Sequence, residues 1–81
     1  MYYVYYLRSQ INGNLYIGST GDLSRRLLLH NNGKVKSTKA YRPWKLLGFE
    51  KFKTRSEAVR RERFLKTHQQ KDLLKERYKL K

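Results

Sequence analysis

Residues 2–18 hold two apolar and aromatic segments with an Asn-Gly pair between them, and this pattern constrains the fold more than any other. Tyr2–Leu7 is aromatic or aliphatic throughout, which favours a strand that is covered on both faces at the centre of a sheet. Leu15–Gly18 is predicted as its partner strand. Because Asn12-Gly13 tolerates positive φ, the two segments are expected to close as a β-hairpin.

The register of this hairpin decides which side chains share a face. A two-residue loop at Asn12-Gly13 pairs positions whose numbers sum to 25, and a four-residue loop from Gln10 to Gly13 pairs positions that sum to 23. Both registers place Tyr5 and Tyr16 on the same face, whereas a three- or five-residue loop would separate them. We therefore expect the two tyrosines to face a common space.

A helix is predicted after the hairpin. Ser19 or Thr20 can cap its start, its first turn carries Asp22, and it is expected to stop around Asn31-Asn32-Gly33. At about 100° per residue, one third of its circumference carries four residues, namely Leu23, Arg26, Leu27 and His30. Two polar side chains therefore lie on the inward-facing stripe of this helix.

The second half of the chain is predicted to add one strand and two helices. Lys34–Arg42 is a basic connection with room for a short helical turn, and Trp44–Phe52 is predicted as the third strand. Thr54–Glu57 matches a capping box that starts a helix ending near Thr67. A last amphipathic helix is predicted over Gln70–Tyr78.

Glu62 is the least expected residue in this pattern, because it lies in the middle of an apolar helix stripe between Val59 on one side and Ala58 and Leu65 on the other. An unpaired buried carboxylate is costly, so Glu62 needs an arginine, a hydroxyl network or a metal ion as its partner. The structural alternative to a functional role is an ion pair with Arg26.

The charge of the chain points to an anionic partner. Twenty Lys and Arg residues stand against six Asp and Glu, a formal net charge of +14, and the resulting self-repulsion favours a nucleic-acid ligand. These residues are spread along the whole chain, which disfavours a membrane surface as the partner. Five basic residues around the connection are the expected contacts with nucleic acid: Lys34, Lys36, Lys39, Arg42 and Lys45.

Length and composition exclude several classes of protein. A chain of 81 residues has room for one domain, 1–81, and its 14% aromatic residues are enough for a core. The absence of cysteine excludes disulfides, thiolate zinc sites and a cysteine nucleophile, and a cytoplasmic location is expected. With no apolar run of about 20 residues and no glycine-rich phosphate loop after a strand, neither a membrane span nor a nucleotide cofactor is expected.

The polar residues also carry a family resemblance. Tyr3-Val4-Tyr5 and Tyr16-Ile17-Gly18, with ten residues between them, resemble the two halves of the GIY-YIG nuclease signature. Arg26, His30 and Glu62 fall where that family carries its helix arginine, a frequent histidine and its metal-binding glutamate. The resemblance covers nearly the whole chain and is closest to the small stand-alone bacterial members. Larger relatives include homing endonucleases and the incision subunit of nucleotide excision repair, a DNA repair pathway.

The resemblance implies a mixed α/β (α+β) fold with a three-stranded antiparallel sheet flanked by helices, in the order β-β-α-β-α-α. It also implies an endonuclease site in which Glu62 holds one Mg²⁺ or Mn²⁺ ion. Arg26 would stabilise charge on the phosphate, and a tyrosine would orient or deprotonate the attacking water. The expected catalytic residues are Tyr5, Tyr16, Arg26, His30 and Glu62. Two departures from the family pattern are Tyr3 at the first glycine and the lack of a late asparagine after Glu62.

Three functions remain open at this point. The first is a monomeric, metal-dependent endonuclease that cuts DNA with low sequence specificity, and the second is a catalytically weak or inactive nucleic-acid-binding module of the same fold. The third is a small RNA-binding or ribosome-associated protein whose aromatic residues stack on bases. Residue by residue, Tyr5 and Tyr16 can also be read as core aromatics, and His30 as a cation at a helix C-terminus.

Overall fold

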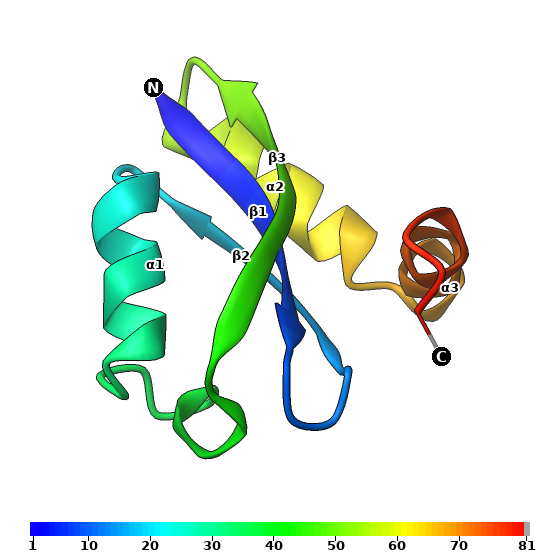
Figure 1. Cartoon of the computed structure of the whole chain (residues 1–81). Helices are drawn as coiled ribbons and strands as arrows, with labels where there is room; N and C mark the ends of the chain where they lie inside the picture. The colour runs from blue at the N-terminus through cyan, green and yellow to red at the C-terminus, as the bar shows by residue number, and fades with distance from the viewer. Residues whose placement is uncertain (81) are drawn as a thin grey trace.

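Strand β1 (Tyr2–Ser9) lies at the centre of a three-stranded antiparallel sheet, between β2 (Leu15–Thr20) and β3 (Trp44–Phe52), as Figure 1 shows. The computed structural model describes residues 1–80, so only Lys81 of the expected domain lies outside the described residues. Val4–Leu7 is buried without interruption because helices cover both faces of the central strand. The predicted position of this segment in the sheet is confirmed.

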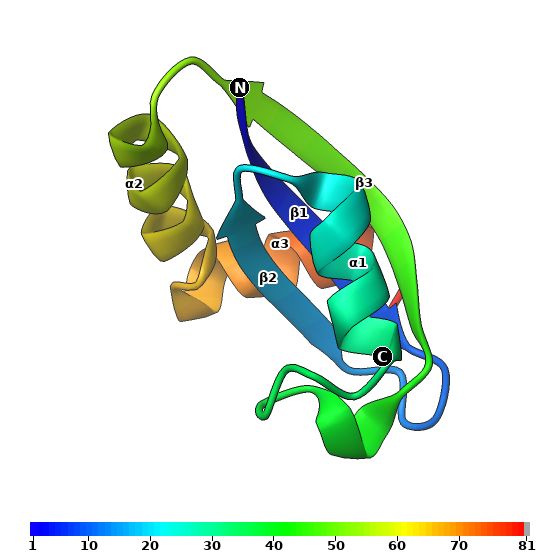
Figure 2. The same ribbon diagram turned by 90° about the vertical axis from the view of Figure 1, so that its left-hand side faces the viewer.

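The helices follow the predicted order β-β-α-β-α-α, so the expected fold class is confirmed. They are α1 (Leu23–Asn31), α2 (Arg55–Leu65) and α3 (His68–Arg77), and the connection after α1 contains a short 3₁₀ helix, η1 (Lys39–Tyr41). In Figure 2, β2 lies between α1 and α2, so residues from both helices can meet at the outer edge of β2.

The two faces of the sheet carry separate cores. The α1 face is aromatic and is built from Tyr5, Leu7 and Trp44, with Tyr16, Leu23, Leu27 and Leu46 packed against them. The face toward α2 and α3 is mostly aliphatic and is built from Val4, Tyr6, Leu15, Ile17, Ala58, Leu65 and Leu74. The alternation of side chains along β1 therefore sends Tyr5 and Tyr6 into different environments.

The hairpin adopts the four-residue loop of the two acceptable registers. Tyr5 pairs with Gly18 and Leu7 pairs with Tyr16, so paired positions sum to 23. Gly13 in the loop has a φ of 74°, which glycine adopts without steric cost. Tyr5 and Tyr16 consequently share the α1 face, with ring centroids 6.3 Å apart.

The predicted cap of the first helix is wrong. Asp22 is the N-cap residue of α1, and its carboxylate accepts a hydrogen bond from the backbone N–H of Arg25 at 3.1 Å. Ser19 and Thr20 instead extend β2 by two residues beyond the predicted strand. The last two helices also differ in their bounds, because α2 ends at Leu65 and α3 already begins at His68.

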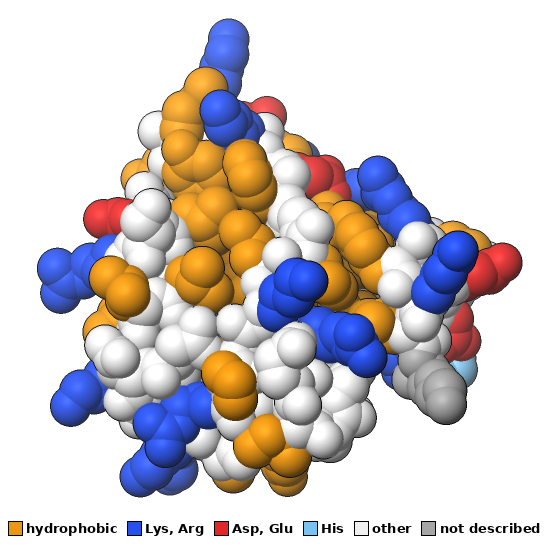
Figure 3. Space-filling model, in the orientation of Figure 1, with side chains coloured by type: hydrophobic (Ala, Val, Ile, Leu, Met, Phe, Trp, Pro, Cys, Tyr) orange, Lys and Arg blue, Asp and Glu red, His pale blue; other side chains and the backbone are white. Residues whose placement is uncertain are grey.

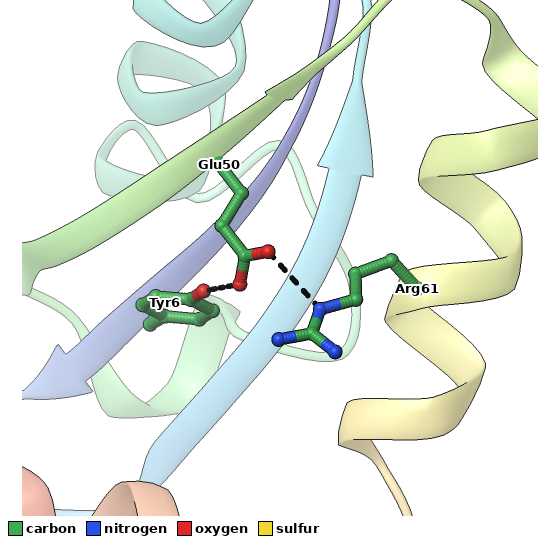
Figure 4. Close-up of polar contacts among 3 residues, drawn as sticks. All are labelled: Tyr6, Glu50 and Arg61. Atoms are coloured by element: carbon green, nitrogen blue, oxygen red, sulfur yellow. Dashed lines mark hydrogen bonds and ion pairs between the residues drawn. The ribbon is translucent and has the colours of Figure 1, made fainter.

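An ion pair on the face of the sheet toward α2 and α3 holds α2 against the strands (Figure 4). Tyr6 of β1 donates a hydrogen bond to Glu50 of β3, and Glu50 accepts a second one from Arg61 Nε of α2 at 3.0 Å. Burial and the neighbouring carboxylate raise the pKa of Tyr6, so this hydroxyl stays protonated and acts as a donor. One turn of α2 is thereby held against two strands.

None of the helices within residues 1–80 is both long enough and apolar enough to span a lipid bilayer.

We expect Thr54→Ala to destabilise the protein by about 1 kcal/mol, because Thr54 and Glu57 form the predicted capping box at the start of α2. This loss corresponds to a melting temperature lower by about 4–8 °C in a domain of this size. Thermal unfolding followed by circular dichroism measures it. Ser56→Ala on the exposed first turn of α2 is the matched control, and an equal drop in both variants would contradict the role of the cap.

Candidate active site

Two tyrosines and a histidine form a close cluster on the α1 face of the sheet. The His30 ring lies 5.6 Å from the Tyr5 ring and 5.1 Å from the Tyr16 ring, both measured between centroids in edge-to-face geometry. Tyr5 and His30 are fully or almost fully buried, whereas Tyr16 is half-buried. The hairpin register and the predicted inward stripe of α1 thus bring three of the five expected site residues together.

His30 is held by hydrogen bonds at both ring nitrogens. Its Nε2 lies 2.8 Å from the Tyr5 hydroxyl, and its Nδ1 lies 2.7 Å from the hydroxyl of Thr38. Burial and the positive charge of Arg26 lower the pKa of His30 to about 4. The ring is therefore neutral near pH 7, and the alternative reading of His30 as a cation at the end of the helix is wrong.

The Tyr5 hydroxyl fits into the space left by Gly18. A Cβ atom added at Gly18 would lie 2.5 Å from the Tyr5 oxygen, so no larger residue is accommodated without moving the tyrosine. Burial raises the pKa of Tyr5 to about 12, although the neighbouring Arg26 guanidinium acts to lower it. Tyr5 consequently keeps its proton at neutral pH.

Arg26 reaches from α1 to the edge of β2 and enters a cavity of about 350 Å³. The lining residues are Tyr2, Ser19, Thr20, Gly21, Arg26, Arg55, Ala58 and Val59. Arg26 Nε is buried and has no hydrogen-bond partner among residues 1–80. The cavity is therefore lined by two arginines and three residues that carry a hydroxyl, without an acidic residue, and this composition favours an anion.

Glu62 lies at the same edge of β2, on the side of α2. It accepts hydrogen bonds from the Ser19 hydroxyl at 2.5 Å and from Lys66 Nζ at 2.7 Å, and its side chain is 19% exposed. Although burial acts to raise it, the hydrogen bonds from Lys66 and Ser19 hold the pKa of Glu62 below its usual value. The carboxylate is therefore ionised, and the alternative of an ion pair with Arg26 is wrong.

Two residues that contact the expected site residues, Lys66 and Thr38, were not predicted from the sequence. Lys66 follows Glu62 by four residues on α2, which is the spacing of a helical ion pair and could have indicated the contact. Its ammonium group also lies 5.9 Å from the centroid of the Tyr16 ring, so it connects the carboxylate with the aromatic cluster. Thr38 lies in the irregular connection, where sequence spacing gives no comparable signal.

Glu62 is the residue at this edge that could hold a hard divalent cation. Glu62 provides an ionised oxygen ligand, and no cluster of three His, Asp or Glu side chains occurs among residues 1–80. Mg²⁺ commonly binds in this way, through one or two carboxylates with water and phosphate oxygens as the remaining ligands. Such an ion would compete with Lys66 for one oxygen of Glu62.

The five basic residues expected to bind nucleic acid are all exposed and lie around η1, at the C-terminal end of α1. None of them lines the cavity that holds Arg26. Arg42 is partly restrained, because its Nε donates to the backbone oxygen of Lys39 at 3.0 Å. The connection thus forms a separate basic surface next to the end of α1 that carries His30.

The fold and these contacts define a class: a small, strongly basic α/β domain with two tyrosines on one face of the sheet, beside an arginine and an ionised glutamate at the sheet edge. A family model of the GIY-YIG catalytic domain matches residues 1–79, and the chain belongs to the GIY-YIG family. This is a family of endonucleases, so the domain is of the kind that acts on nucleic acid.

Individual relatives are small bacterial proteins. The chain is 40% identical over 75 residues to a UPF0213 protein of Staphylococcus saprophyticus, covering 91% of this chain and 90% of the relative. It is 46% identical over 65 residues to a UPF0213 protein of Streptococcus agalactiae, covering 79% and 73%. The solution NMR structure of a UPF0213 protein from Bacillus halodurans is similar at 35% identity and a TM-score of 0.56, covering 91% of this chain and 82% of that one.

Acidification is expected to destabilise the folded protein through His30. The unfolded chain takes up a proton on this residue near pH 6.5, but the folded protein does so only near pH 4. Between these values the unfolded state binds more protons, so the free energy of unfolding should fall with decreasing pH, by up to about 3 kcal/mol. Urea unfolding at pH 7.0, 6.0 and 5.0 measures this slope.

Two variants test whether His30 causes this pH dependence of the free energy of unfolding. His30→Gln should lose the pH dependence between pH 6.5 and 5, whereas His68→Gln should keep it, because the His68 side chain is 95% exposed. If the His68 variant lost the slope instead, the buried neutral state of His30 would be wrong.

Proposed function

We propose that this protein is a divalent-metal-dependent endonuclease that hydrolyses phosphodiester bonds in DNA with low intrinsic sequence specificity. The observation that carries this proposal is the proximity of buried Tyr5 and His30, with Tyr16 beside them, to Arg26 and Glu62 at the edge of β2, from two strands and two helices. Hydrolysis of a phosphodiester needs preorganised cations, an oriented water and a polar site, and this edge supplies groups suited to each role.

Arg26 is assigned the role of binding the phosphate group of the substrate. Arg26 lines the cavity and forms no ion pair with a carboxylate among the described residues, so a phosphate in the cavity would share its charge. Arg55 at the first position of α2 also lines this cavity and is exposed. A second guanidinium at this place offers a phosphate contact in a chain that lacks the late asparagine between Glu62 and Leu80.

The two tyrosines are assigned different tasks. Tyr5 keeps its proton, because burial raises its pKa to about 12 and its hydroxyl is hydrogen-bonded to His30. Its oxygen can accept a hydrogen bond from the attacking water and so orient it. Tyr16 is half-buried and lies beside Lys66, so its hydroxyl is the one that can approach the water from the solvent side.

Glu62 is assigned the role of ligand to a Mg²⁺ or Mn²⁺ ion. When bound, such an ion supplies a Lewis acid for the phosphoryl oxygen and lowers the pKa of bound water. The Ser19 hydroxyl holds one carboxylate oxygen of Glu62 in place, and the ionised state of Glu62 is ready for a cation at neutral pH. Lys66 keeps this carboxylate paired in the absence of metal.

Nucleic-acid binding without turnover is the second candidate, and one surface feature favours the form of it in which aromatic residues stack on bases. Tyr3 of β1 and Phe49 of β3 form an edge-to-face pair at 5.9 Å, and Phe49 is 46% exposed. In Figure 3, hydrophobic side chains gather over β1 and β3, and Lys and Arg side chains lie around them. Exposed aromatic residues among basic ones are typical of surfaces on which unpaired bases stack.

The enzyme reading predicts that Glu62→Gln abolishes cleavage, lowering the rate by at least about 100-fold, because the neutral amide no longer attracts the metal ion. Binding of DNA should persist, since a negative charge is removed from the site. Stability should change little, with a melting temperature within about 3 °C of the parent, because Lys66 is 46% exposed and can turn to water.

The measurement is cleavage of single-stranded, duplex and branched DNA and of RNA, with Mg²⁺, with Mn²⁺ and with EDTA, beside a thermal melt. Glu76→Gln on the exposed surface of α3 makes the same charge change and is the matched control. Parent protein that binds all substrates and cuts none would favour the binding module, and full cleavage by the Glu62 variant would refute the metal-ligand assignment.

Affinity for duplex DNA is expected to fall steeply with salt, with a log–log slope of about −0.9 for each phosphate contact. Replacing Lys36 and Lys39 together by Gln should make this slope shallower by about 1.8 if each residue contacts one phosphate. Fluorescence anisotropy between low and moderate salt measures the change. The control replaces Lys71 and Lys75 of α3, and an equal effect there would mean that binding is spread over the whole surface.

A further inference from the structure

Thr38 is a fully buried polar residue in the basic connection between α1 and β3. Its backbone oxygen accepts a hydrogen bond from the indole N–H of Trp44 at 2.9 Å, which anchors the segment to the aromatic core. Its hydroxyl points at the Nδ1 atom of His30, 2.7 Å away, and lies 3.4 Å from the backbone oxygen of Val35. The side chain therefore ends a buried chain of hydrogen bonds that begins at Tyr5.

The direction of each hydrogen bond between Tyr5, His30 and Thr38 follows from which groups can donate and which can accept. Tyr5 is 1% exposed, and His30 is the one hydrogen-bond acceptor of its hydroxyl among residues 1–80. Arg26 next to it can only donate. We therefore assign Tyr5 as the donor to Nε2 of His30, since no other hydrogen-bond acceptor for its proton is found among residues 1–80.

The positions of the protons on His30 and Thr38 are then determined as well. If Nε2 accepts, the neutral ring carries its proton on Nδ1, which donates to the Thr38 hydroxyl. The Thr38 hydroxyl in turn donates to the backbone oxygen of Val35. The opposite arrangement gives Nε2 the proton and leaves the hydroxyl proton of buried Tyr5 without a partner, which costs about 1–3 kcal/mol.

We propose that Thr38 is a positioning residue of the active site, which holds neutral His30 in the Nδ1–H tautomer so that Nε2 accepts a hydrogen bond from the Tyr5 hydroxyl. This inference rests on the proposed function, because it assigns Tyr5 the role of presenting its oxygen to the reacting water. With its proton turned toward His30, the Tyr5 oxygen keeps its lone pairs for a donor on the side of Arg26. Thr38 acts through His30 and touches no substrate itself.

The contact between Thr38 and His30 also links the site to the basic connection. Thr38 directly precedes Lys39 and lies within the segment that carries the exposed basic residues of the connection. The segment expected to meet phosphates is therefore the same one that orients His30, and its conformation determines both contacts.

Nitrogen-15 NMR of the imidazole rings tests the tautomer directly and without any activity measurement. The chain has two histidines, and the exposed ring of His68 serves as an internal reference. We expect His30 to show a protonated Nδ1 and an unprotonated Nε2 at pH 7, with an Nδ1 proton that exchanges slowly with water. A spectrum with the proton on Nε2 would overturn the proposal.

Three variants separate the hydroxyl of Thr38 from its packing. Thr38→Val keeps the shape and removes the acceptor, so the slowly exchanging Nδ1 proton should disappear and the ring should sample both tautomers. Thr38→Ser keeps the hydroxyl and should restore the single tautomer. Ser37→Ala, at the exposed neighbouring position, is the matched control and should match the parent protein.

Cleavage kinetics supply the second readout. Thr38→Val should lower kcat by about tenfold with KM within about twofold, and Thr38→Ser should recover most of the loss. Unchanged kcat in the Val variant, or a Ser variant that behaves like Val in the spectrum, would overturn the positioning role. If the parent protein cuts no substrate, the proposed nuclease function fails, while the ring spectra of the parent and Ser variant still decide the tautomer.

Discussion

The contact between Tyr5 and Gly18 is the constraint on which the rest of the site depends. The two residues are paired across the hairpin, and the missing side chain of Gly18 leaves the room that the Tyr5 hydroxyl occupies. From there the hydroxyl meets His30, and the ring stays close to Tyr16. A shift of one residue in the register would turn every side chain of β2 to the other face, so the loop of the hairpin fixes the geometry of the site.

Polar groups at the site fall into two kinds with different energetics. His30 and Thr38 are fully buried and uncharged, and their hydrogen bonds satisfy them, because a charge would be expensive where water is absent. Arg26, Glu62 and Lys66 lie at the edge of β2 and retain charge where solvent and an anionic ligand can reach them. The buried groups therefore orient the site, and the edge groups are the ones that can bind a phosphate and a metal ion.

The fold was largely predictable from the sequence, because the apolar and aromatic strand segments, the Asn-Gly loop and the capping box are local signals with strong physical causes. The partners of individual side chains were less predictable. The helical wheel places Glu62 inward, but it could not show that Ser19 stays in β2 and that Ser19 and Lys66, not Arg26, are its partners. Likewise, Thr38 comes from an irregular segment whose path depends on the indole of Trp44, which no periodic pattern reveals.

Because the aromatic face of the sheet is both core and site, a mutation there changes the stability of the protein as well as the geometry of the site. Tyr5 packs in the same cluster as Leu7 and Trp44, so removing it opens the core as well as the site. His30 is bound on both sides, and losing it strands the hydroxyls of two neighbours. Arg26 and Glu62 are less buried and belong to no apolar cluster, so changes in activity there report on chemistry more directly than changes at the tyrosines. An 81-residue chain has little apolar surface to spare, and building part of its core from site residues makes stability and activity depend on the same contacts.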